Sequence, residues 1–97
     1  MDKPKVVIYT TGFCPYCIWA RRLLDAKGVE YEDIRVDQHP ERRPEMEARS
    51  GRTSVPQIFI GDLHIGGYDD MAALDRQGRL DPILEGTATT LEQETQS

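Results

Sequence analysis

The sequence feature that most constrains this chain is a pair of cysteines between a predicted strand and a predicted helix. Residues 6–9 are apolar and mostly β-branched, residues 10–12 read Thr-Thr-Gly, which is typical of a turn, and residues 18–24 have a helical pattern. Cys14 and Cys17 stand between them, separated by a proline and a tyrosine. The pair therefore lies where a strand passes into a helix, with Cys14 at the start of the first turn.

This position has a chemical consequence for Cys14. The first N–H groups of a helix lack internal partners and the helix dipole is positive there, so a thiolate at Cys14 is stabilised. Pro15 suits the first turn because its missing N–H would have had no partner. Cys17 lies three residues on, on the same helical face and close enough to form a disulfide with Cys14. We therefore predict that Cys14 is the low-pKa nucleophile of a thiol–disulfide reaction and that Cys17, with the pKa of an ordinary thiol, resolves it.

Two other interpretations of the cysteine pair are weaker. A structural disulfide would close a ring of only four residues, which stabilises a fold very little. A zinc site needs four ligands, and the remaining candidates, His39 and His64, lack the usual spacing. We expect no metal, and we expect His39 to be a surface or capping residue and His64 to point to solvent. A C-x-x-C motif between a strand and a helix instead indicates thiol redox chemistry.

Length and charge restrict the class of protein to which the chain can belong. The 97 residues predict a single domain over 1–84, followed by a polar, disordered tail over 85–97 that carries no chemistry. The net charge of −5 argues against nucleic-acid binding. We find no apolar run that could span a membrane and no signal segment, and two cysteines within one motif fit a reducing compartment. We expect a cytoplasmic protein.

The rest of the chain predicts an α/β domain. The first predicted β-α-β unit (strand 6–9, helix 15–27, strand 30–36) implies a parallel pair of strands. A predicted helix at 41–50 precedes a hairpin, whose strands end at residue 60 and resume at 63. We predict a last helix at 71–77, capped by Asp69 or Asp70, and a short turn at 80–84. The order β-α-β-α-β-β-α predicts a four-stranded mixed sheet flanked by helices.

Three motifs in this order resemble those of the glutaredoxins, closest to the small bacterial dithiol type. They are the Cys-Pro-Tyr-Cys unit, the Thr-Ser-Val-Pro loop at 53–56 and the Gly-Gly-Tyr-Asp-Asp loop at 66–70. The resemblance covers about residues 5–84. It implies a thioredoxin-like fold and glutathione-dependent thiol–disulfide exchange, with glutathione as co-substrate and no tightly bound cofactor. We expect a monomer whose other partners are glutathionylated or disulfide-containing proteins.

The resemblance also implies a glutathione site around two of these loops. In the family the proline of the second loop is cis, and Val55 and Pro56 match that position, so that the Val55 backbone pairs with the cysteine of glutathione. From the residues alone, Pro56 equally suits the start of an edge strand. The loop that includes Gly67 and Tyr68 opens a helix, whose N–H groups suit the γ-glutamyl carboxylate.

Charged and aromatic side chains complete the implied site. Asp69 and Asp70 would accept from the γ-glutamyl ammonium, while Arg52, with Arg49 as a second candidate, would bind the glycyl carboxylate. Either arginine equally suits a solvated surface. Tyr16 matches the family tyrosine that packs over the tripeptide. The chain departs from the family pattern in two places: Thr11 stands where many members have lysine, and Tyr68 stands where a small residue or cysteine is frequent.

Two other function classes remain open on the sequence. One is a glutaredoxin-like electron donor that a flavoprotein reductase reduces in place of glutathione; the matches to the glutathione site, Arg52 and the two aspartates, argue against it. The other is a non-enzymatic iron–sulfur dimer, in which Cys14 of two chains and two glutathiones hold the cluster. Pro15 disfavours this assembly because it limits how the loop opens around a cluster.

Overall fold

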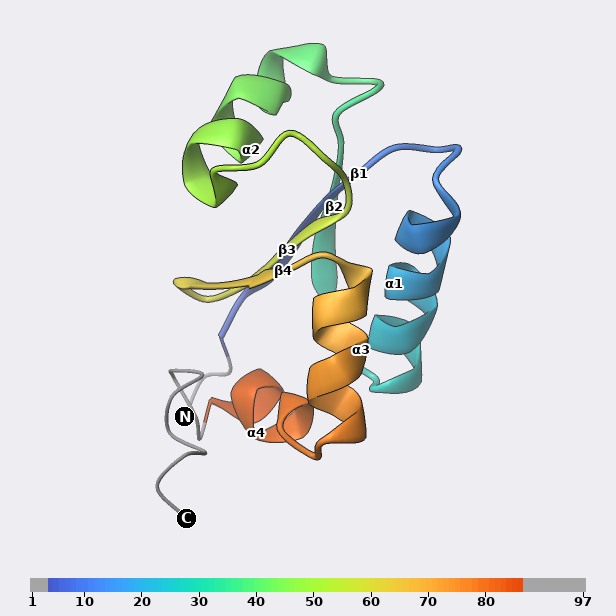
Figure 1. Cartoon of the computed structure of the whole chain (residues 1–97), viewed down its shortest axis with the longest axis vertical. Coiled ribbons are helices and arrows are strands. Elements are labelled where there is room, and N and C mark those ends of the chain that lie inside the picture. Colours follow the sequence, from blue (N-terminus) through green and yellow to red (C-terminus); the bar gives the residue numbers. More distant parts are fainter. Residues whose placement is uncertain (1–3, 87–97) are drawn as a thin grey trace.

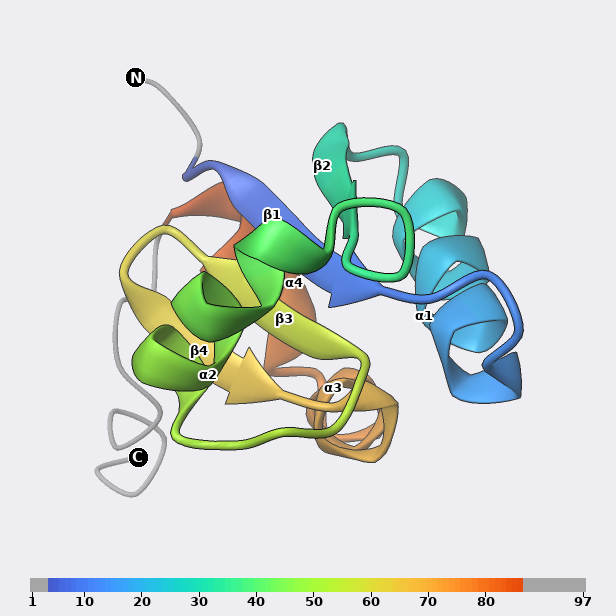
Figure 2. The same cartoon turned by 90° about the horizontal axis from the view of Figure 1, so that it is seen from above.

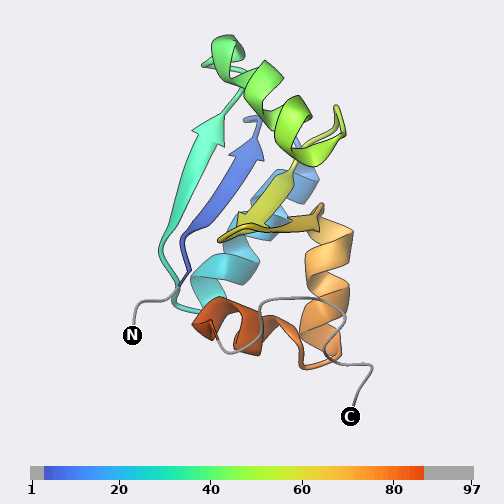
Figure 3. The same cartoon turned by 90° about the vertical axis from the view of Figure 1, so that its left-hand side faces the viewer.

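β1 (Val6–Thr10) is the strand on which the sheet is built. In this computed structural model, which describes residues 4–86, the strand order is β2-β1-β3-β4. β1 runs parallel to β2 (Tyr31–Arg35) and antiparallel to β3 (Gln57–Ile60), and β4 (Leu63–Gly66) is antiparallel to β3. Figure 3 shows β1 and β2 side by side and pointing the same way. The predicted four-stranded mixed sheet is confirmed.

Helices cover both faces of this sheet. Figure 1 shows α2 (Arg43–Ser50), with the short 3-10 helix η1 (Pro40–Arg42) before it, on one side of the strands. On the other side lie three helices: α1 (Pro15–Ala26), α3 (Tyr68–Arg76) and α4 (Leu80–Glu85). All five residues of β1 are buried for this reason, which agrees with its continuous apolar sequence.

The two faces of the sheet form separate apolar clusters. The cluster under α1, α3 and α4 contains Ile8 and Ile58 from the sheet together with Leu24, Met71 and other helix residues. The cluster under α2 includes the following side chains: Val7, Tyr9, Ile34, Val36, Met46 and Phe59. Because alternate residues of a strand point to opposite faces, each central strand supplies both clusters. The helices that carry the functional groups are thereby fixed to the sheet.

Two predicted helices begin at other residues than expected. The predicted helix at 41–50 is divided into η1 and α2, and a proline lies in the first turn of each. α3 begins at Tyr68, so the prediction that Asp69 or Asp70 caps it is wrong. Gly67 is the N-cap, and the Asp70 carboxylate, in the first turn, accepts from the Gly67 N–H at 2.9 Å. Because the Asp70 carboxylate reaches back by one turn to the N-cap, α3 starts three residues before the predicted helix at 71–77.

The end of the domain is more ordered than the predicted short turn. Residues 80–85 form α4, in which Leu80, Ile83 and Leu84 are buried in the larger cluster. The predicted tail therefore starts inside a helix, and its residues 87–97 lie outside the described part of the chain. No helix within residues 4–86 has the length and apolar character needed to cross a membrane.

The packing of α2 gives a first prediction. Met46 is fully buried between α2 and the sheet, so Met46→Ala should lower the free energy of unfolding by about 2–5 kcal/mol through lost contacts and an unfilled cavity. Urea unfolding followed by circular dichroism measures this change. Glu47→Ala, on the partly exposed side of the same helix, is the matched control and should change stability by less than about 0.5 kcal/mol. Equal effects of the two variants would contradict the assigned packing.

Candidate active site

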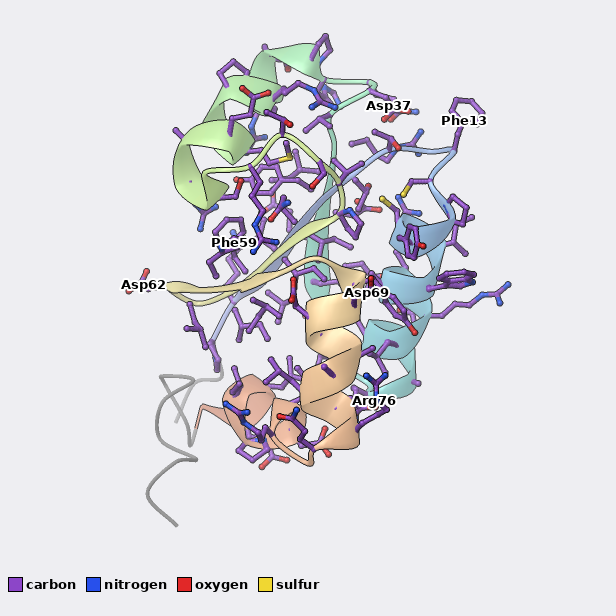
Figure 4. The ribbon with its side chains drawn as sticks, in the orientation of Figure 1. Phe13, Asp37, Phe59, Asp62, Asp69 and Arg76 are labelled. Carbon is purple, nitrogen blue, oxygen red and sulfur yellow. The ribbon has the colours of Figure 1, made fainter. Side chains whose placement is uncertain are left out.

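The two cysteines lie at the start of α1, as predicted. Cys14 is the N-cap residue with an extended backbone, Pro15 is the first helical residue, and the N–H groups of Cys17 and Ile18 donate to the Cys14 carbonyl at 3.1 and 3.2 Å. The loop before them projects from the molecule: Phe13, labelled in Figure 4, points outward and is 93% exposed. Cys14 therefore stands at the edge of the protein, where a large disulfide substrate has access.

Burial makes the two thiols different. Both cysteines are free thiols; Cys14 is partly exposed, whereas Cys17 is completely buried. The pKa of Cys17 is raised to about 11, chiefly by burial and also by the neighbouring Cys14 thiol, while the Thr11 backbone and the charge of Arg21 oppose the shift. The prediction of an ordinary thiol at Cys17 is therefore wrong. It underestimated the desolvation of a side chain that points into the domain.

The loop before β3 faces Cys14. The peptide bond between Val55 and Pro56 is cis, as the family resemblance implied. The Cys14 thiol donates a long hydrogen bond to the Val55 carbonyl, with 3.8 Å between sulfur and oxygen. A residue on the first helix and a residue 41 positions later in the chain thus form one wall of the site.

A groove begins at this contact and follows the start of α3. It has a volume of about 210 Å³. Figure 2 shows the chain segments that enclose it, the start of α1, the loop before β3 and the start of α3, at one side of the molecule. All eight residues predicted to bind glutathione line it: Tyr16, Arg52, Val55, Pro56, Gly67, Tyr68, Asp69 and Asp70. A larger hollow, about 580 Å³, lies at the opposite end of β1, away from the cysteines.

Opposite charges meet in this groove. Arg52 Nη1 lies 3.4 Å from Asp70 Oδ2, and each side chain is about half exposed (50% and 51%). Asp69, labelled in Figure 4 at the start of α3, is exposed beside them. The first N–H groups of α3 add partial positive charge at the same place. The groove therefore presents a cation, two carboxylates and a helix N-terminus within one small volume.

An aromatic cluster forms one border of the groove. The ring of Trp19 lies 5.2 Å from that of Tyr16 and 5.8 Å from that of Tyr68, and the two tyrosine rings are 6.5 Å apart. These contacts join α1 to the first residue of α3. From the sequence, Trp19 was assigned only to the predicted helix. Its position three residues after Tyr16 was a signal that the two rings share a face.

Gly66 is a second residue whose role was not evident from the sequence. Its φ is +114°, in the region that favours glycine. A Cβ atom at this position would lie 2.3 Å from Asp70 Oδ2. Glycine is therefore required here for the Asp70 carboxylate to reach back to the Gly67 N–H and shape the end of the groove.

His64 does not point to solvent, so that prediction is wrong. Its ring stacks on Phe59 at 4.8 Å, and its Nε2 lies 2.8 Å from Oε1 of the buried Gln57. The Gln57 amide donates to the Ser54 carbonyl at 3.0 Å, so this network reaches the loop before β3. Burial, followed by the charge of Arg52, lowers the pKa of His64. The error arose because α2 covers this face of the sheet.

Two other polar residues have clear places. His39 is exposed and precedes η1 as its N-cap, as predicted. Arg49 is not at the groove: its guanidinium lies 4.2 Å from the ring centre of Phe59 and donates to the Tyr9 hydroxyl at 2.8 Å. It belongs to the α2 face of the sheet, which leaves Arg52 as the arginine that lines the groove. Within residues 4–86 no three His, Cys, Asp or Glu side chains are arranged to hold a metal ion.

Comparison with known proteins agrees with this geometry. The family model described as Glutaredoxin matches residues 6–65. A glutaredoxin of Pseudomonas aeruginosa is 54% identical over 81 residues, which cover 84% of this chain and 96% of that protein. Glutaredoxin 3 of Escherichia coli is 54% identical over 80 residues, covering 82% of this chain and 96% of its own length.

Solved structures show the same relationship. The solution structure of glutaredoxin from Brucella melitensis superposes with a TM-score of 0.79 at 46% identity, covering 93% of this chain and 98% of that one. A buckwheat glutaredoxin–glutathione complex superposes with a TM-score of 0.76 at 32% identity, covering 84% and 76%. With its cysteine pair at the start of α1 and a groove beside it, the chain belongs to the glutaredoxin family of thiol–disulfide oxidoreductases and has the thioredoxin-like fold.

Proposed function

We propose that this glutaredoxin uses glutathione to reduce protein–glutathione mixed disulfides and protein disulfides, with Cys14 as nucleophile and Cys17 as resolving thiol. The observation that carries the proposal is the contact between the Cys14 thiol and the Val55 carbonyl at the end of a charged groove. A reactive thiol and a site of suitable size for part of a small zwitterionic peptide are thereby adjacent. That a buckwheat relative was solved as a complex with glutathione supports the same ligand here.

The first half-reaction needs Cys14 alone. The Cys14 thiolate attacks the glutathionyl sulfur of a mixed disulfide, a new S–S bond forms, and the protein sulfur leaves as a thiolate that takes a proton from water. A second glutathione thiolate then attacks the sulfur of the bound glutathionyl group. Oxidised glutathione leaves and Cys14 is restored as a thiolate. No general base is required, because the helix N-terminus stabilises the attacking and leaving thiolate.

Protein disulfides follow a second route. Cys14 attacks one sulfur of the substrate and forms a protein–protein mixed disulfide, releasing one substrate thiolate. Cys17 then attacks Cys14 Sγ, which releases the second substrate thiolate and leaves a disulfide between the two cysteines. Two molecules of glutathione reduce it. Cys17 must lose its proton in the resolving step, and its raised pKa makes this step demanding.

The groove charges match the two ends of glutathione. The γ-glutamyl group carries an ammonium and a carboxylate, which suit Asp69 or Asp70 and the N–H groups at the start of α3, respectively. The glycyl carboxylate suits Arg52. Tyr16 and Tyr68, fixed by Trp19, cover the peptide from the side. Entry of the ligand separates Arg52 from Asp70, and each then has a partner of opposite charge on the ligand.

The choice of electron donor tests the proposal directly. A small glutathionylated substrate should be reduced with glutathione and glutathione reductase, and not with a flavoprotein thioredoxin reductase as sole donor. The consumption of NADPH measures both reactions. Reduction by the thioredoxin reductase alone would instead support the class of glutaredoxin-like donors that do not use glutathione.

The different environments of the two thiols predict selective alkylation. At mildly acidic pH iodoacetamide should modify Cys14 about a hundredfold or more faster than Cys17, because Cys17 is buried and its pKa is raised to about 11. Peptide mapping of the alkylated protein measures the ratio. Since thiolate reacts and thiol does not, modification of Cys17 should increase with pH up to about 11. Preferential labelling of Cys17 would reverse the assignment.

The two routes predict different effects of the two serine variants. Cys17→Ser should keep much of the activity on a small glutathione mixed disulfide, because a second glutathione performs the last step. Cys14→Ser should have no activity on any disulfide. The coupled assay with glutathione reductase measures both variants. An inactive Cys17→Ser protein with normal circular dichroism would show that the route through Cys14 alone is wrong.

The charges at the start of α3 predict a substrate-specific loss. Replacing Asp69 and Asp70 together by asparagine keeps their size and removes their charge. The loss of a charge-assisted hydrogen bond costs about 1.5–3 kcal/mol, which corresponds to a decrease in kcat/KM of roughly tenfold to a hundredfold for glutathionylated substrates. Reduction of a simple disulfide without a glutamyl group is the control and should change far less. If both activities decrease equally, or neither does, the γ-glutamyl group binds elsewhere.

A further inference from the structure

Gln57 is a completely buried polar side chain at the start of β3, and the mechanism above gives it no part. It lines the groove together with Ser54, Val55 and Pro56, yet its exposed fraction is 0%. A primary amide that is removed from water needs partners for its oxygen and for its N–H groups, because an unpaired buried polar group costs free energy. The partners of this amide therefore decide which part of the site it supports.

The sheet brings Gln57 to His64. Side chains of β3 alternate between the two faces, so Gln57 and Phe59 both point to the face that α2 covers. Phe59 is labelled in Figure 4 on this side of the strands. His64 of β4 pairs with Phe59 across the strands, and its ring stacks on that of Phe59. From there His64 Nε2 reaches Gln57 Oε1 at 2.8 Å, on the diagonal of the strand pair.

The Gln57 amide has only one orientation that satisfies this network. The Ser54 carbonyl, 3.0 Å from Gln57 Nε2, is an acceptor, so the NH2 group faces it. The amide oxygen then faces His64, whose Nε2 must carry a proton and donate. Burial, followed by the charge of Arg52, lowers the pKa of His64, so the ring is neutral at pH 7 and Nδ1 carries no proton. His64 thereby fixes the amide, and the amide fixes the Ser54 carbonyl.

The direction of the Ser54 carbonyl decides the direction of the Val55 N–H. The two groups belong to one peptide unit, which is trans and planar, so they point in opposite directions. The carbonyl is held toward Gln57, on the α2 side of the sheet. The Val55 N–H is therefore directed to the other side, where α1 and α3 begin and the groove lies. The Val55 carbonyl, in the next peptide unit, already faces the Cys14 thiol there.

We propose that Gln57, oriented by His64, is a positioning residue for glutathione: it holds the Ser54 carbonyl so that the Val55 N–H donates to the backbone carbonyl of the ligand's cysteine. The inference rests on the proposed function, which brings that cysteine beside Val55. Because Gln57 is completely buried, it acts through this one peptide unit and not by contact with the ligand. Without the amide, the peptide unit is free to rotate, and the Val55 N–H loses its direction.

The test uses three disulfides that share one leaving group and differ in what they offer to Val55. They are the mixed disulfides of nitrothiobenzoate with glutathione, with cysteinylglycine and with cysteamine. The first two have a backbone carbonyl on the cysteine, the second lacks the γ-glutamyl group, and the third has no peptide backbone. The reduced full-length protein attacks each through Cys14 and releases nitrothiobenzoate, whose absorbance in a stopped-flow instrument gives the second-order rate constant.

Gln57→Leu keeps the approximate volume of the side chain and removes its hydrogen bonds. The rate constants for the glutathione and cysteinylglycine disulfides should both decrease about three- to tenfold, the effect of one lost hydrogen bond. The rate constant for the cysteamine disulfide should be unchanged, because this group has no carbonyl for Val55. Replacement of Asp69 and Asp70 by asparagine should instead slow only the glutathione disulfide, since the other two have no γ-glutamyl group.

Two further variants separate the hydrogen bond from the volume of the side chain. Gln57→Glu keeps the size and an oxygen toward His64, but the ionised carboxylate has no N–H for the Ser54 carbonyl, so it should be as slow as Gln57→Leu. Gln38→Leu makes the same change as Gln57→Leu at an exposed glutamine after β2 and should leave all three rate constants unchanged. A normal glutathione rate in Gln57→Glu would show that the donor to Ser54 is not needed.

The tautomer of His64 gives a test that needs no variant. Long-range ¹H–¹⁵N spectra of the unchanged protein at pH 7 should show a proton on Nε2 of His64 and none on Nδ1. A proton on Nδ1 alone would turn the Gln57 amide round and place its oxygen against the Ser54 carbonyl. That result would refute the proposal even if Gln57→Leu failed to fold.

The remaining outcomes are distinguishable. If the unchanged protein reacts with all three disulfides at one rate, the groove does not bind the peptide, and the proposed use of glutathione fails together with the role of Gln57. A preference for the glutathione and cysteinylglycine disulfides that survives in Gln57→Leu refutes the role of Gln57 alone. Equal losses on all three disulfides would show that Gln57 only supports the fold.

Discussion

The pairing of β1 with strands on both sides is the constraint on which the site depends. β1 is parallel to β2 and antiparallel to β3, and β4 is antiparallel to β3. The carboxyl ends of β1 and β4 and the amino end of β3 therefore lie at the same end of the sheet. The cysteine loop, the Val55–Pro56 loop and the start of α3 follow or precede these strand ends. Three segments distant in sequence form one groove because the sheet has this order.

The same arrangement gives the two cysteines their separate roles. A helix that starts at the sheet edge and then packs on the sheet turns its N-cap residue outward and the residue three positions later inward. Cys14 is thereby accessible at the helix N-terminus, and Cys17 is buried with a pKa raised to about 11. A nucleophile needs the first environment. The resolving thiol reacts only after a mixed disulfide has formed at Cys14, so it tolerates the second environment, and the charge of Arg21 limits the cost of its ionisation.

The order of strands and helices along the chain could be predicted from the sequence, because it depends on local patterns. The eight predicted residues that line the groove could be named because they belong to or adjoin three specific motifs. It was insufficient where distant contacts decide. His64 alternates with apolar residues as a solvated residue does, but its ring stacks on Phe59 and contacts the buried Gln57 on the α2 face of the sheet. The start of α3 depends on Asp70 reaching back past Gly66, and Arg49 is drawn away by Tyr9 and Phe59. Short-range rules do not contain such contacts.

The resting groove also bears on specificity. Arg52 and Asp70 are paired with each other, so neither charge is unsatisfied before a ligand arrives. A ligand with a carboxylate alone would satisfy Arg52 and leave Asp70 without its cation, while an amine alone would have the opposite effect. Breaking the pair is compensated only when the ligand carries both charges at the separation of the two side chains. In the proposed complex, discrimination for a zwitterionic peptide thus follows from an ion pair that the ligand must replace on both sides.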